Sequence, residues 1–271
     1  MEKNLLEICD LNLSYHTKKS ETLALKDLSF YVKTNELVSI VGPSGCGKTT
    51  ILSIIAGLLS PSSGSVILDN KSVSGVTQDI GYMFQKDNLF NWLTVEDNVM
   101  FGLKLQKRLT EENKSIVYSL VEKYGLTEFL HHYPTQLSGG MRQRVSLIRT
   151  LALNPKLLLL DEPFSALDYQ TRLKIQDIVF NIMKAEHKTA LMVTHDIGEA
   201  IAMSDRIIIL TKRPASVKKI IELDFPAELS PFERRNDSKF KEYFNEIWEE
   251  LMTWKKIPKT PSPFQMNTLN I

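Results

Sequence analysis

One eight-residue segment constrains the fold of this chain more than any other. It fits the pattern G-x-x-x-x-G-K-[ST] and lies between the apolar run Leu37–Val41 and a helix-like stretch, the context that the pattern requires. Its glycines let backbone N–H groups converge on a phosphate, and the helix N-terminus adds partial positive charge. We therefore predict a phosphate-binding loop rather than a plain glycine-rich turn. Its members are Gly42, Pro43, Ser44, Gly45, Cys46, Gly47, Lys48 and Thr49.

Two of these side chains have expected roles of their own. Lys48 is long enough to reach the outer phosphates of a bound nucleotide, and Thr49 supplies a hydroxyl suited to Mg²⁺. A second polar element supports them, because the apolar run 157–160 is followed by Asp161 and Glu162. Open α/β sheets bind ligands where strands end, and adjacent strand residues point to opposite sides. We expect Asp161 to hold the metal and Glu162 to act as the general base, the alternative being an acid pair that caps a helix.

Short apolar runs alternate with helix-length segments along most of the chain. The runs 37–41, 157–160, 189–193 and 207–210 predict buried strands. The periodic stretches between them predict helices at 49–59, 142–152, 170–185 and 198–203. This alternation predicts an α/β fold with a largely parallel sheet.

Three other regions depart from the alternation. Residues 6–15 and 23–32 show partial two-residue periodicity, which predicts a small antiparallel N-terminal sheet. Residues 88–154 lack a convincing strand and predict an inserted helical subdomain. We assign 1–225 to the main domain and 226–271 to a C-terminal extension.

The extension contains a helix with one apolar face. This face either packs on the main domain or serves as a regulatory or partner-binding surface. Its apolar positions recur at intervals of four, three, four and three: Phe240, Phe244, Ile247, Leu251 and Trp254.

Composition excludes several classes of protein. Lys plus Arg number 33 against 32 Asp plus Glu, so no global charge attracts nucleic acid or anionic lipid. Cys9 and Cys46 offer neither a disulfide framework nor metal-ligand spacing, which favours a reducing, cytoplasmic compartment. We find no signal peptide and no apolar span long enough for a membrane, so work at a membrane requires a partner.

Residues 137–140 form a second element suited to anions. Ser138 is placed to cap the helix that follows, and Gly139 and Gly140 expose backbone N–H groups. A simple capped helix is the alternative. Two such cradles with a single lysine-bearing loop favour a nucleotide shared between two copies of the chain in a two-fold dimer.

With these motifs, residues 6–224 resemble the ATP-binding subunits of ABC (ATP-binding cassette) transporters, and Leu137-Ser138-Gly139-Gly140 matches their signature. The resemblance implies a P-loop NTPase with a RecA-like core that uses ATP and Mg²⁺. It also implies a head-to-tail homodimer in which Ser138 and Gly140 of one copy contact the γ-phosphate bound by Lys48 of the other. Met141 replaces a glutamine common in the family but leaves the backbone cradle intact.

The resemblance assigns five further residues. It implies that Tyr15 stacks on adenine, that Thr50 completes the nucleotide contacts of the loop, and that Gln85 reaches Mg²⁺ and the attacking water. It also implies that His195 contacts the γ-phosphate and that Asp168 crosses the dimer interface. Without the resemblance these side chains would be assigned ordinary structural roles, such as a tyrosine at a strand end or an aspartate that caps a helix.

The chain is most similar to the importer branch of this family. It has no fused membrane spans, carries one lysine-bearing loop, and places only 53 residues between Gln85 and Ser138, too few for the long coiled coil of DNA-repair relatives. Residues 84–95 and the C-terminal part resemble the nitrate, sulfonate and taurine group, which includes pyrimidine-precursor importers. The implied partners are transmembrane permease subunits and, indirectly, an extracytoplasmic solute-binding protein, with no nucleic acid.

This resemblance places the protein at the cytoplasmic face of the membrane. We predict that Leu89, Phe90 and Trp92 line a groove for a cytoplasmic helix of the permease, or else pack the core of their own helical subdomain. The alternative function is a soluble ABC-type ATPase switch that acts on a cytosolic protein or nucleic acid.

Overall fold

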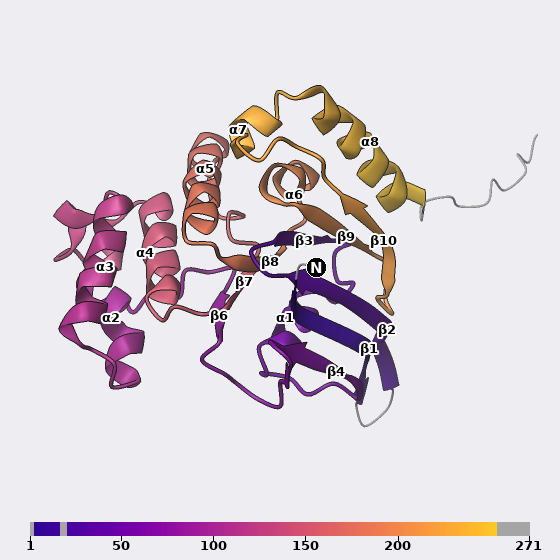
Figure 1. Cartoon of the computed structure of the whole chain (residues 1–271), viewed down its shortest axis with the longest axis horizontal. Helices are drawn as coiled ribbons and strands as arrows, with labels where there is room; N and C mark the ends of the chain where they lie inside the picture. Colours follow the sequence, from indigo (N-terminus) through magenta and orange to yellow (C-terminus); the bar gives the residue numbers. More distant parts are fainter. Residues whose placement is uncertain (1–2, 17–20, 254–271) are drawn as a thin grey trace, which may run out of the picture.

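The chain forms two β-sheets in the computed structural model, which describes residues 3–16 and 21–253 (Figure 1). The larger sheet has six strands, of which only the edge strand β10 runs antiparallel to its neighbour. In spatial order they are β10 (Val217–Glu222), β9 (Arg206–Leu210), β3 (Leu37–Val41), β8 (Thr189–Val193), β7 (Leu157–Asp161) and β6 (Ile80–Met83).

The four central strands of this sheet are the four apolar runs predicted from the sequence. Every residue of β3, β7, β8 and β9 is buried, as expected for parallel strands covered on both faces. In their register Ile40, Val193 and Asp161 lie side by side. The loops after β3, β7 and β8 therefore leave the same edge of the sheet.

The smaller sheet confirms the predicted antiparallel pair at the N-terminus and extends it. β1 (Asn4–His16) pairs with β2 (Glu21–Lys33) and with β4 (Ser63–Leu68), which in turn pairs with β5 (Lys71–Ser72). The sequence analysis did not predict β4, β5, β6 or β10. β6 contains Gly81, where an added Cβ would come within 2.6 Å of Thr150, so close packing rather than strand propensity determines this element.

Three of the helices that pack on the sheets follow strands β3, β7 and β8. They are α1 (Lys48–Ile55), α5 (Tyr169–Ala185) and α6 (Ile197–Met203). α1 lies between the two sheets, because its Ile51 shares a hydrophobic cluster with Leu6 of β1 and Leu157 of β7. The prediction that this helix continues to residue 59 is wrong. The chain turns at Gly57, whose φ of 71° is left-handed and whose surroundings leave no room for a Cβ.

Residues 88–154 contain no strand and form a helical region that extends away from the large sheet (Figure 1). It comprises α2 (Val95–Leu105), α3 (Glu111–Lys123), two short 3₁₀ helices (Thr127–Phe129 and Pro134–Gln136) and α4 (Gly139–Leu151). Threonine or serine side chains cap the three α-helices at Thr94, Thr110 and Ser138. The buried amide of Asn98 bonds to backbone groups of Phe90, Leu93 and Thr94 and so holds the turn that precedes α2.

The C-terminal part ends in α7 (Pro231–Arg234) and α8 (Ser238–Met252). Ile247 of α8 is fully buried, and Phe240, Phe244 and Leu251 pack against the same cluster, which includes Ile201 of α6. The apolar face therefore covers the main body of the protein, the first of its two predicted uses. Trp254, the last position of that face, lies outside the described residues. In the part of the chain that the structure describes, no helix has the length and apolar character of a membrane span.

Candidate functional site

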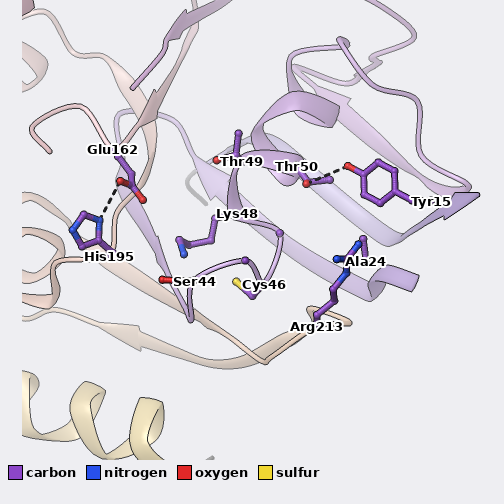
Figure 2. A pocket seen from close by; sticks show the side chains of 12 residues that line it. Tyr15, Ala24, Ser44, Cys46, Lys48, Thr49, Thr50, Glu162, His195 and Arg213 are labelled. Atoms are coloured by element: carbon purple, nitrogen blue, oxygen red, sulfur yellow. Dashed lines mark hydrogen bonds and ion pairs between the residues drawn. The ribbon is translucent and has the colours of Figure 1, made fainter. Parts of the chain in front are cut away.

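A cavity of about 540 Å³ opens at the strand edge where the loops after β3, β7 and β8 meet (Figure 2). Most of its wall is the glycine-rich loop and the start of α1. Tyr15 and Arg213 lie at one end, whereas Glu162 and His195 lie at the other, with Lys48 between them. The lining residues are Tyr15, Ala24, Ser44, Gly45, Cys46, Gly47, Lys48, Thr49, Thr50, Glu162, His195 and Arg213.

The backbone of the loop requires glycine at two positions. Gly45 and Gly47 have φ values of 73° and 123°, which side chains rarely allow. The Lys48 ammonium donates hydrogen bonds to the carbonyl oxygens of Gly42 (3.0 Å) and Pro43 (3.1 Å) and is thereby held over the loop. An ammonium held over a glycine-rich loop at the start of a helix fits the predicted anion site.

Cys46 belongs to the wall of the loop rather than to its chemistry. Its side chain is 2% exposed, and burial raises the pKa of its thiol. A thiol that is hard to ionise reacts slowly with electrophiles. The structure therefore does not support a reactive cysteine at this position.

Asp161 is the most buried carboxylate of the site. Its Oδ1 accepts a hydrogen bond from Thr49 Oγ1 (3.1 Å), and its Oδ2 accepts one from the hydroxyl of Tyr82 (3.2 Å). Burial raises the pKa of Asp161, and the two hydrogen bonds and the charge of Lys48 oppose this rise without cancelling it. A hydroxyl and a carboxylate are hard oxygen donors, and a divalent cation would compensate this buried charge, so the pair fits Mg²⁺.

Three polar side chains from three different loops meet on the other side of Asp161. Glu162 Oε2 lies 3.1 Å from His195 Nδ1 and accepts a hydrogen bond from Gln85 Nε2 at 3.0 Å. These residues follow β7, β8 and β6 respectively, so the parallel register brings them together. Glu162 has a left-handed φ of 46°, and its amide donates to the carbonyl of Val193 (2.9 Å). Such strain in a non-glycine residue is typical of functional sites.

The opposite end of the cavity presents a flat aromatic surface. The Tyr15 hydroxyl is 3.4 Å from Thr50 Oγ1, and the ring is 39% exposed. The guanidinium carbon of Arg213 lies 5.9 Å from the centre of that ring. The sequence analysis assigned no site role to Arg213. No local motif marks it, because it reaches the cavity from the turn between β9 and β10.

Eight predicted residues are absent from the described lining of this cavity: Gly42, Pro43, Gln85, Asp161, Ser138, Gly139, Gly140 and Asp168. The last four come from the start of α4 and the start of α5. Ser138 caps α4 by accepting a hydrogen bond from the Met141 amide (3.3 Å), and Asp168 caps α5 by accepting one from the Thr171 amide (3.0 Å). Gly139 instead lines a neighbouring cavity of about 550 Å³, which also includes Gln85, Glu162 and His195. Ser138, Gly140 and Asp168 line neither cavity.

A glycine loop carrying Lys48 and Thr49, with the Asp161–Glu162 strand end beside it, defines a P-loop NTPase. A profile for the family described as "ABC transporter" matches residues 25–165, just over half of the chain. The chain belongs to the ABC transporter family.

Three curated relatives are similar over most of their length. One is an uncharacterized ABC transporter ATP-binding protein, YtlC of Bacillus subtilis, 46% identical over 93% of this chain and 98% of YtlC. The nitrate import ATP-binding protein NrtD of Synechocystis is 40% identical over 89% of this chain and 93% of NrtD. The taurine import ATP-binding protein TauB of Yersinia pestis is 44% identical over 74% of this chain and 79% of TauB.

A solved structure has the same fold. It is the dimeric bacterial ABC transporter cassette MJ0796, 34% identical, with a TM-score of 0.71 over 82% of this chain and all of that one. A post-hydrolysis dimer of MJ0796 bound to ADP and phosphate gives a TM-score of 0.70 at 33% identity.

Proposed function

We propose that this chain is the ATP-hydrolysing subunit of an ABC importer and couples closure of a dimer to solute uptake through separate membrane subunits. The observation that carries the proposal is the convergence of Gln85, Glu162 and His195, of which Glu162 and His195 line the same cavity as Lys48 and the ring of Tyr15. The import names of relatives such as NrtD and TauB support the same function.

The hydrolytic step follows from the arrangement of the cavity. Tyr15 stacks on the adenine, and the loop amides and Lys48 hold the phosphates. Glu162 accepts a proton from the water that attacks the γ-phosphate in line, while His195 and Gln85 fix the carboxylate and the water by hydrogen bonds. Held by Thr49 and Asp161 with Gln85 nearby, Mg²⁺ would neutralise charge that develops on the phosphate oxygens.

A second copy of the chain completes the site. Ser138, Gly139, Gly140 and Asp168 have no place in the nucleotide cavity of their own chain, as expected if they act on the cavity of a partner. Dimers of the related cassette MJ0796 support this assembly. ATP shared between a loop and a facing helix N-terminus would hold a head-to-tail dimer closed, and hydrolysis would release it.

The helical region 88–154 is the proposed contact with the permease, within a cassette of residues 1–225 followed by an extension, 226–271. Leu89 is 8% exposed and packs in the core of its own region, so it does not line a docking groove. Trp92 is 74% exposed, and its ring centre lies 5.2 Å from that of Phe90. An exposed Trp92 beside a half-buried Phe90, at the turn that follows Gln85, fits a helix of a membrane partner.

The solute class proposed is that of the nitrate, sulfonate and taurine group or a related pyrimidine precursor. This places the protein at the cytoplasmic face of the membrane, with an extracytoplasmic solute-binding protein as an indirect partner and no nucleic acid. Because solute contacts in such an assembly belong to other subunits, the evidence for the class is the similarity to NrtD and TauB.

Glu162→Gln tests the catalytic assignment. The variant should bind ATP and form a stable dimer, measured by light scattering after size exclusion, but lose about 10²- to 10⁴-fold in turnover, the usual contribution of a general base. The matched control is Glu186→Gln, on a partly exposed residue that pairs with Lys123. Full hydrolysis by Glu162→Gln would exclude Glu162 as the base.

The trapped dimer also tests the importer assignment. Tagged Glu162→Gln protein with ATP should recover a multispanning protein from detergent-solubilised membranes. Recovery of soluble partners alone would favour a cytosolic ATPase switch and would leave the ATPase assignment intact.

A further inference from the structure

One side chain joins two of the loops that matter for hydrolysis. Arg172, in the first turn of α5, donates from Nη2 to the carbonyl oxygen of Leu167 (3.0 Å), and its Nη1 lies 3.4 Å from Asp196 Oδ2. Leu167 immediately precedes Asp168, and Asp196 immediately follows His195. The guanidinium therefore bridges the loop proposed to face the second copy and the loop that carries the hydrolytic histidine.

The loop of His195 is ordered at the point where Arg172 holds it. The amide of Asp196 donates to Thr194 Oγ1 (3.0 Å), and Asp196 Oδ1 accepts from the Glu199 amide (3.0 Å) to cap α6. The Asp196 carboxylate thus caps α6 with Oδ1, while its Oδ2 faces Arg172. A shift of the guanidinium would consequently move the start of α6 and the residue before it.

The geometry of the bridge requires arginine. Two nitrogens at the end of a rigid, planar fork reach two acceptors in different loops, which a lysine ammonium does not match. Arg172 Nε is buried and has no partner among the described residues, so the side chain is held by the two Nη contacts. Arg172 does not line the nucleotide cavity and has no direct contact with Glu162 or His195 among the described interactions.

We propose that Arg172 is a positioning residue that couples the loop of Asp168 to the loop of His195, so that docking of the second copy orients the histidine for hydrolysis. This inference rests on the proposed function of the chain as an ATPase that works as a dimer. It predicts that the bridge affects the chemical step and leaves the binding of ATP unchanged.

The test compares four forms of the full-length protein: wild type, Arg172→Met, Asp196→Asn and the double variant. Asparagine keeps the cap of α6 but removes the charge that faces Arg172. Each single variant should lower kcat by about ten- to a hundredfold, the scale of a misplacement of roughly 1 Å, while affinity for a fluorescent ATP analogue stays within about twofold. The double variant should be no slower than either single variant, because both remove the same interaction.

Two further variants separate positioning from general damage. Lys174→Met alters an exposed residue of the same helix and should keep wild-type kcat and melting temperature. Arg172→Lys keeps the charge but not the planar fork of the guanidinium. It should recover only part of the activity that Arg172→Met loses, and it should have the melting temperature of the wild type.

The outcomes distinguish this inference from the proposed function. Wild-type kcat in Arg172→Met, multiplied losses in the double variant, or full activity in Arg172→Lys would overturn the coupling and leave the ATPase function standing. A wild-type protein without ATPase activity would overturn the proposed function and the inference with it.

Discussion

A buried glutamate below the loop of His195 should make the stability of this protein fall as the pH rises. Glu199 of α6 is 4% exposed; one carboxylate oxygen accepts from Thr194 Oγ1, and the other has no partner among the described residues. Burial is the main cause that raises the pKa of Glu199 to about 7, and Asp196 acts in the same direction. The hydrogen bond from Thr194 and the charges of Arg172 and Arg235 oppose the rise but do not cancel it.

The direction of the effect follows from proton linkage. The pKa in the folded protein lies above the ordinary value of 4.5, so the folded state binds this proton more tightly than the unfolded state. The resulting stabilisation is complete below the unfolded pKa and is lost as the pH rises from there through the folded pKa. Between pH 5 and pH 8 the loss is about 2–3 kcal/mol, at 1.36 kcal/mol per pKa unit.

Glu199→Gln isolates this contribution. Glutamine keeps an oxygen that accepts from Thr194 but cannot ionise, so the variant should gain about 2–3 kcal/mol relative to wild type when the pH is changed from 5 to 8. Urea unfolding followed by circular dichroism at both pH values measures this difference. The comparison of the two proteins cancels every other titrating group, including the five histidines.

One control variant and one possible result decide whether Glu199 causes this pH dependence. Glu242→Gln, on the exposed side of α8, should leave the pH profile of the unfolding free energy unchanged. An equal effect of Glu199→Gln at pH 5 and pH 8 would mean that Glu199 has the same pKa in the folded and unfolded states, and would refute the reasoning.

Two further predictions concern the binding of ATP and the packing of α8 on the rest of the protein. Lys48→Ala should weaken ATP binding by about ten- to a hundredfold in a fluorescence titration, because hydrogen bonds to a charged group contribute about 1.5–3 kcal/mol, whereas Lys241→Ala on α8 should not change it. Ile247→Ala should lower the free energy of unfolding by about 2–5 kcal/mol through loss of a fully buried side chain, and Glu249→Ala on the exposed side of the same helix by less than about 0.5 kcal/mol. Unchanged affinity in the first case or an unchanged melting temperature in the second would contradict them.

Local patterns in the sequence were sufficient to predict the centre of this fold. The eight residues 42–49 specify their loop because glycine geometry, a lysine and a helix start act within one turn of the chain. The strands β3, β7, β8 and β9 were predicted because burial on both faces leaves an unbroken apolar run. Asp161 and Glu162 could be located because they end one of those runs.

Elements that depend on distant contacts were not predicted from the sequence. β6 is four residues long and contains Gly81, so its strand character comes from pairing with β7 and from close packing against α4. Leu89 and Trp92 have similar apolar side chains three residues apart, yet the first is buried and the second exposed. The turn held by the buried Asn98 separates them, and no periodicity describes that turn.

The sequence by itself was enough to predict which residues bind phosphate, metal and water, because those motifs are short and chemically specific. Only the tertiary structure decided how they meet. Gln85, Glu162 and His195 are separated by 77 and 33 positions, and the parallel register of β6, β7 and β8 brings them within hydrogen-bond distance. Arg213 reaches the cavity, and Arg172 reaches the loops of Leu167 and Asp196, in the same way, since long-range packing sets where a side chain ends and local sequence does not encode that position.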